Sequence, residues 1–220
     1  MARSRAPRII ARILKLLMLL LVLTVTGILL WRVCFSENYK EVKGLHSNDK
    51  LEQAYNEHGK DLILQYQVQP SITKSDRSYG YFSVVECVFI PQINQVQLVV
   101  RYNNSTLDHL KEDYDLSKAP SRRTHVFDVT LSVTSENPAD ACRIFPTEEP
   151  KYEETKLYTY RRYTFDNVPL NDLTTGIFVD IYYVEDIDYE KEAYGTLLIY
   201  DPASPWRPYN PTRKEWKRLE

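Results

Sequence analysis

The feature that most constrains this chain of 220 residues is an uncharged apolar run near its start. Residues 16–31 read LLMLLLVLTVTGILLW, and with their apolar neighbours they approach the ~20 residues that cross a bilayer. The run is longer than the roughly 7–15 residues of a signal peptide core, and residues 32–36 (RVCFS) lack the small-residue pattern of a cleavage site. We therefore predict a short basic tail at 1–15 and an uncleaved transmembrane helix at 16–34.

Charge is distributed unevenly along the chain. The first 36 residues contain six of the 28 basic residues and none of the 30 acidic ones. Basic residues before the apolar run favour a cytosolic N-terminus and a C-terminal part in the lumen or outside the cell. A cleaved signal peptide and a mitochondrial presequence with an inner-membrane anchor remain alternatives, since the start is rich in Arg. The net acidic remainder argues against nucleic acid as a partner.

The composition changes twice after the apolar run. Residues 35–60 are polar, and Asn48 could cap a short helix at Asp49–His58 that Gly59 would end, so we predict a polar stalk. From residue 61 onward, apolar and polar residues alternate in seven or eight segments rich in β-branched and aromatic residues. Alternating strands must bury one face against a second layer, so we predict one all-β antiparallel sandwich at 61–220. The main strand segments are 62–68, 81–90, 95–102, 124–134, 156–165, 177–184 and 196–200, and the helical segments are 107–114 and 212–219.

Three stretches carry a family resemblance. Residues 80–100 include GYF and NQVQLVV, residues 163–169 read YTFDNVP, and residues 180–200 read DIYYVEDIDYEKEAYGTLLIY. In order and spacing they are similar to the opening hairpin, the "F.F.VP" strand and the "V.V.D.D.....IG...I" hairpin of C2 domains, the eight-stranded sandwiches of synaptotagmins and protein kinase C. The resemblance runs from Gly80 to Tyr200, and it implies an eight-stranded C2-like fold.

The same resemblance implies where calcium would bind. C2 loops hold this cation with several carboxylates, because calcium prefers six to eight oxygen ligands. Asp186 and Asp188 fall at the paired aspartate positions, and Asp108 is the matched candidate on the first loop. The family's "DPYV" aspartate falls near His125, and its third carboxylate in the other loop falls at Tyr194. We therefore expect a vestigial site that binds calcium no more tightly than roughly 10⁻⁴ M.

Covalent chemistry and catalysis have few candidates. Cys87 and Cys142 could form a disulfide in an oxidising compartment, or remain as buried free thiols. No Trp lies between them, which argues against an immunoglobulin sandwich. Asn103 and Asn104 each begin an N-glycosylation tripeptide, which is modified only in a lumenal domain. No motif for a nucleophile elbow, zinc protease, phosphate loop or CxxC pair occurs, so we predict neither an enzyme nor a cofactor.

Two functions are compatible with these features. The first is a single-pass protein of the endomembrane system or cell surface that presents a calcium-independent C2-like module to an unknown protein partner, as an accessory subunit of a membrane complex. The second is a cytosol-facing C2 protein that binds lipid or calcium in trafficking or membrane tethering. The charge bias, the glycosylation tripeptides and the missing carboxylates favour the first.

Overall fold

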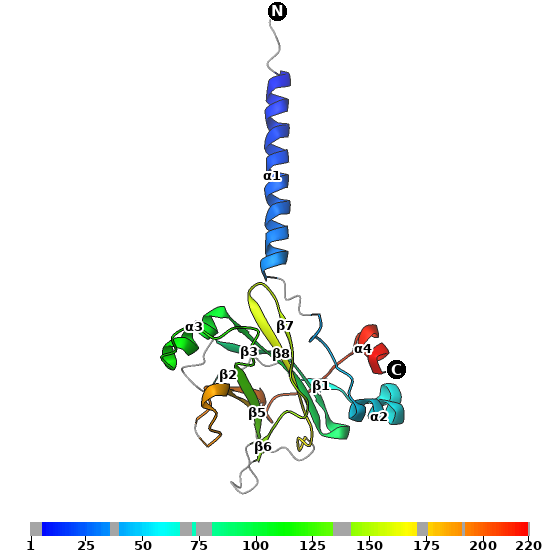
Figure 1. Cartoon of the computed structure of the whole chain (residues 1–220). Helices are drawn as coiled ribbons and strands as arrows, with labels where there is room; N and C mark the ends of the chain where they lie inside the picture. The colour runs from blue at the N-terminus through cyan, green and yellow to red at the C-terminus, as the bar shows by residue number, and fades with distance from the viewer. Residues whose placement is uncertain are drawn as a thin grey trace, which may run out of the picture. The chain divides into compact units, whose positions relative to one another are not determined.

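The structure is a computed structural model that describes residues 6–35, 40–66, 72–73, 81–133, 142–170, 176–190 and 192–219. The chain forms two compact units, Met1–Asn38, whose described residues are helical, and Tyr39–Glu220, whose described residues are mostly β-structure (Figure 1).

The first unit contains one helix, α1 (Ala6–Phe35). Within it, Arg12–Trp31 is long and apolar enough to cross a membrane, judged by length and composition, and these side chains are exposed. The hydroxyl of Thr24 donates to the carbonyl oxygen of Leu20 at 2.8 Å, so this polar group is satisfied inside the helix, as apolar surroundings require. A helix over the predicted apolar run is confirmed, although it begins within the expected basic tail.

The second unit contains a six-stranded sheet A and a five-stranded sheet B. In sheet order, sheet A consists of β11 (Arg207–Pro208), β1 (Gln65–Tyr66), β3 (Phe82–Ile90), β4 (Gln95–Asn103), β8 (Tyr158–Phe165) and β7 (Lys151–Glu154). Sheet B consists of β2 (Ile72–Thr73), β10 (Gly195–Tyr200), β9 (Ile177–Tyr183), β5 (Phe127–Val133) and β6 (Cys142–Ile144). All the described pairings are antiparallel.

The long strands β3, β4, β5, β8, β9 and β10 coincide with predicted strand segments, so the mostly β, antiparallel class is confirmed. The expected count of eight strands is not, because short strands such as β2, β6, β7 and β11 lack an alternating pattern long enough to recognise. β1 lies within the predicted segment 62–68. The remaining elements are α3 (Asn104–Asp113), which follows β4, and the short 3₁₀ turns η1 (Gly59–Asp61), η2 (Pro91–Ile93) and η4 (Val184–Asp186).

One hydrophobic core is shared by the two sheets. Alternate residues of the long strands supply it, because successive side chains of a strand point to opposite faces. Two such sets are Val96, Leu98, Val100 and Tyr102 in β4, and Phe127, Val129, Leu131 and Val133 in β5. Both are the faces that the alternation predicts. His125, which the same pattern adds to the β5 face, is exposed and precedes the strand.

The outer face of sheet A is covered by a further layer. It consists of α2 (Asp49–His58), the segments on either side of it, and α4 (Arg213–Leu219) at the C-terminus. Figure 1 shows α2 (cyan) beside α4 (red), and the rings of Tyr55 and Trp216 lie 5.3 Å apart between them. The predicted helix α2, with Asn48 as its N-cap and Gly59 at its end, is confirmed.

This layer corrects the expected polar stalk at residues 35–60. Val42 and Leu45 are 1% and 0% exposed, and Leu51 and Ala54 of α2 are also buried, so residues 40–60 belong to the folded β unit. The composition suggested a stalk because apolar residues are sparse here. Those few residues meet the apolar outer face of sheet A, and that contact depends on the tertiary structure.

Candidate functional site

Residues 40–46, here called the strap, are held against sheet A through their backbone. Glu153 in β7 accepts the N–H groups of residues 40, 41 and 42, the first and third at 3.0 and 3.3 Å. Gln97 in β4 accepts the N–H of His46 at 2.9 Å and donates to its carbonyl oxygen at 2.8 Å. Because side chains of the sheets bind main-chain groups, the strap is fixed along its length.

Arg162 in β8 lies at the centre of these contacts and is 3% exposed. Its Nε donates to the carbonyl oxygen of Val42 at 2.7 Å, its Nη1 to Oε1 of Gln97 at 2.8 Å, and its Nη2 to the carbonyl oxygen of Gly44. Nη2 also lies 3.8 Å from Oε2 of Glu86, which accepts the N–H of Gly44 at 2.9 Å. Removing one charged partner from this buried network should destabilise the fold strongly, because the remaining charge would stay desolvated without compensation.

Glu215 in α4 holds the strap from the C-terminal side. It accepts the N–H of Leu45 at 2.7 Å, the N–H of Thr212 at 2.6 Å, and the hydroxyl of Tyr209. Burial acts to raise the pKa of Glu215, but the hydrogen bonds from Thr212, Tyr209 and Leu45 outweigh it and leave the pKa below its ordinary value. The Tyr209 hydroxyl also lies 3.3 Å from Oε1 of Glu86, so it connects two carboxylates.

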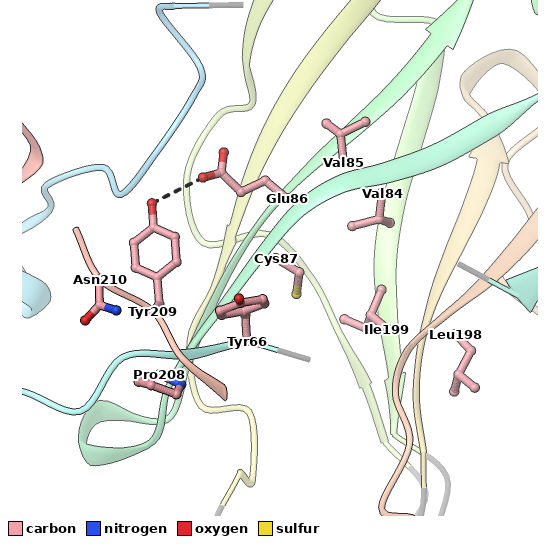
Figure 2. A pocket seen from close by; sticks show the side chains of 10 residues that line it. All are labelled: Tyr66, Val84, Val85, Glu86, Cys87, Leu198, Ile199, Pro208, Tyr209 and Asn210. Carbon is pink, nitrogen blue, oxygen red and sulfur yellow. Dashed lines mark hydrogen bonds between the residues drawn. The ribbon is translucent and has the colours of Figure 1, made fainter. Parts of the chain in front are cut away.

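A cavity of about 440 Å³ adjoins this network (Figure 2). A β-bulge between Val84 and Glu86 shapes it. Because of the bulge, Val84 and Cys87 both pack against the core although they are three positions apart, while Glu86 joins the polar network. The cavity is lined by Tyr66, Val84, Val85, Glu86, Cys87, Leu198, Ile199, Pro208, Tyr209 and Asn210.

The chemistry of this cavity favours binding over catalysis. Among the described residues of its lining, Glu86 is the one that carries a charge, and its side chain is 14% exposed. Burial and the nearby charge of Glu86 raise the pKa of the Cys87 thiol above its ordinary value. Arg162 acts in the opposite direction, but its effect is smaller. A thiol that stays protonated is a poor nucleophile. Apart from Asn210 and Cys87, the other lining residues are aromatic or aliphatic, which is typical of small-molecule pockets.

Cys87 and Cys142 are free thiols in the structure. Cys87 packs beside β10, whereas Cys142 lies in β6, and β9 and β5 separate β10 from β6 in sheet B. Three strand spacings amount to about 14 Å, beyond the roughly 7 Å that a disulfide spans between Cα atoms. The two cysteines are therefore free thiols in the structure, as the second prediction held, although Cys142 is exposed and not buried.

The carboxylates that the resemblance matches to a calcium site lie in different elements. Asp108 is exposed on α3, and Asp186 is exposed in η4. Asp188 accepts the N–H of Glu190 at 3.0 Å, which shapes the loop after η4. Within the described ranges, no three His, Cys, Asp or Glu side chains come together as a metal site would require.

An aromatic cluster lies where α3 meets the loop before β10. Tyr194, at the position of the family's third carboxylate, donates its hydroxyl to Asp113 at the end of α3 at 2.9 Å. Burial and this hydrogen bond raise the pKa of Tyr194. Its ring lies 6.0 Å from that of Phe82 and 6.1 Å from that of Phe127. The loop before β10 is thereby attached to α3 through a buried tyrosine.

The two glycosylation candidates differ in their surroundings. Asn103 is the N-cap of α3, and its Oδ1 accepts the N–H of Thr106 at 3.1 Å in a capping box. Asn104 is exposed in the first turn of the helix. In the folded domain Asn104 is therefore the more accessible of the two.

Comparisons with the profiles of known protein families, with curated proteins and with solved structures found no match. The likeness to C2 domains accordingly stays a prediction.

Sequence reasoning missed the strap and its network, although a signal was present. Charged residues rarely lie inside apolar strands unless they are paired. The strand that became β3 reads FSVVECVFI, and the one that became β8 reads YTYRRYTF, so Glu86 and Arg162 are both anomalous in their own strands. Their partner Glu215 lies far away in the sequence, and nothing local identifies it.

Proposed function

We propose that this chain is a single-pass membrane protein that presents a non-catalytic, C2-like β domain to a protein partner, as an accessory subunit of a membrane complex. The observation that carries the proposal is the strap. α1 ends at Phe35, and the backbone is already hydrogen-bonded to the β domain from Lys40 onward. Only residues 36–39 lie between these two points in the sequence. The folded β domain therefore follows the anchor closely in the sequence.

A contact surface for a protein partner is supported by the edge strands. Exposed large apolar side chains occur at Phe145 after β6, at Tyr152 in β7 and at Leu157 after β7, with exposed fractions of 49%, 48% and 37%. β6 ends sheet B and β7 ends sheet A in the described strand order. Exposed aromatic groups among charged ones are typical of the contact surfaces of non-obligate complexes.

Site-specific photocrosslinking of the full chain in native membranes tests this function. A photoreactive residue is placed at Phe145 or Tyr152, and a matched control is placed at Glu112, an exposed position of α3. We expect a discrete adduct of defined mass from the first two positions and none from the control. Equal labelling from all three positions, or no adduct from any, would contradict the proposal.

The anchor and the orientation are tested separately. Carbonate extraction should leave the chain in the membrane pellet, because the apolar helix binds the bilayer hydrophobically. Glycosidase treatment should increase gel mobility, and Asn104→Gln should remove most of that shift. A cytosolic domain without glycan would instead support the lipid- or calcium-binding alternative.

A further inference from the structure

We propose that the cavity in Figure 2 binds a small alkylammonium cation, such as a choline-type trimethylammonium group. This ligand site goes beyond the function proposed above and does not depend on it.

The charge of the lining favours a cation. Glu86 is the one charged residue of the lining, so the described wall of the cavity is negative. Behind it, the hydroxyl of Tyr209 connects Glu86 to Glu215, and the ion pair of Glu86 is with Arg162 at 3.8 Å. The network therefore contains two carboxylates and one guanidinium. A carboxylate has about four acceptor positions, so Glu86 can still face a cation in the cavity.

Two aromatic rings in the lining are arranged so that they can surround a cation. The rings of Tyr66 and Tyr209 both line the cavity, with centroids 6.4 Å apart and planes at 86°. Figure 2 shows the two rings side by side, with the hydroxyl of Tyr209 pointing to Glu86. Ring faces attract cations within about 6 Å of their centroids, and aromatic cages of this kind recognise quaternary ammonium groups. Two perpendicular rings and a carboxylate supply the elements of such a cage.

The apolar residues of the lining favour an alkylammonium group over a small hydrated cation. Val84, Leu198, Ile199 and Pro208 are apolar and cannot replace water around a small hydrated ion. Calcium and magnesium need six or more oxygen ligands, which this lining does not provide. Methyl groups on nitrogen spread the charge and can contact apolar walls. The volume of about 440 Å³ lies in the range of small-molecule pockets, ~300–1,000 Å³.

The test is titration calorimetry of the full chain in maltoside micelles, which contain no choline. The probes are choline, tetramethylammonium and 3,3-dimethyl-1-butanol, the neutral isostere of choline. We expect both cations to bind at least about tenfold more tightly than the isostere, because only they interact with Glu86 and the ring faces. Equal affinity for choline and its isostere would overturn the proposal.

Variants locate the binding within the cavity. Tyr66→Leu keeps an apolar wall but removes a ring face, and it should weaken choline binding about fivefold or more, whereas Tyr66→Phe should preserve it. Tyr81→Leu, at a partly exposed tyrosine just before β3 and outside this lining, is the matched control and should bind as the parent does. Choline affinity unchanged by Tyr66→Leu would refute the site. Glu86→Gln should also lose binding, and where that variant fails to fold, Tyr66→Leu decides.

A last comparison identifies the source of the cation. Nanodiscs of phosphatidylcholine or phosphatidylglycerol are added as competitors of choline. Competition by phosphatidylcholine alone supports the site and assigns its ligand to a lipid headgroup. Absence of competition by either lipid, with choline still bound, supports the site with a soluble ligand. Neither result bears on the photocrosslinking test, so failure of the cation site and failure of the proposed function are distinguishable.

Discussion

Gly44→Ala tests whether the strap is seated against Glu215 as the structure shows. Gly44 has φ +81°, and a Cβ atom there would lie 2.3 Å from Oε1 and 2.7 Å from Cδ of Glu215. The left-handed backbone costs an alanine roughly 1–2 kcal/mol. The carboxylate end is flexible, but it can move only by giving up hydrogen bonds from Leu45, Thr212 or Tyr209. Loss of one hydrogen bond to a charged group costs about 1.5–3 kcal/mol.

The expected destabilisation is therefore about 3–5 kcal/mol, a large part of the ~5–15 kcal/mol that stabilises a typical domain. Gly59→Ala is the matched control, because Gly59 has φ +58° and nothing within 4 Å of a Cβ atom. It should cost only backbone strain, about 1–3 kcal/mol.

The assay is urea unfolding of the full chain in micelles, followed by Trp fluorescence, since Trp216 packs on Tyr55. A double-mutant cycle with Glu215→Ala should be strongly non-additive, because removing the carboxylate relieves the clash. The reasoning is refuted if Gly44→Ala costs no more than Gly59→Ala, or if its effect simply adds to that of Glu215→Ala.

Three further predictions concern acid stability, the core and a helix cap. Folding lowers the pKa of Glu215, so the ionised carboxylate stabilises the fold above the unfolded pKa of ~4.3, and this stabilisation is lost as pH falls through the folded pKa. Glu215→Gln should therefore make the free energy of unfolding less dependent on pH in this acidic range, as measured by urea titrations at a series of pH values. Val129 is 1% exposed in the shared core, and Val129→Asp should abolish cooperative unfolding, because an unpaired buried charge costs several kcal/mol; a soluble variant that melts sharply would show that the core face is misassigned. Asn103→Ala removes the cap of α3 and should cost ~1 kcal/mol in urea unfolding, whereas exposed Asn104→Ala should stay within ~0.5 kcal/mol; equal effects would contradict the capping geometry.

The sequence by itself determined the elements whose signals are local. The apolar run of α1 follows from composition. The long strands follow from alternation, as in β4 and β5, where the predicted face is the one that packs into the core shared by the two sheets. Helix α2 follows from Asn48 and Gly59, because capping depends on residues within one turn. These features need no knowledge of distant parts of the chain.

The tertiary structure alone decided the strap, the cavity and the absence of a Cys87–Cys142 bond. Glu215 reaches Leu45 across 170 positions, and Arg162 reaches Val42 across 120. Short strands such as β6 and β7 exist because a longer neighbour, β5 or β8, presents an open edge, which their own residues do not encode. A bulge in β3 between Val84 and Glu86 puts Glu86 on the opposite face from Val84, and so brings a carboxylate beside Tyr66 and Tyr209. Contacts of this kind depend on the packing of whole layers, which is why alternation, capping and composition could not reveal them.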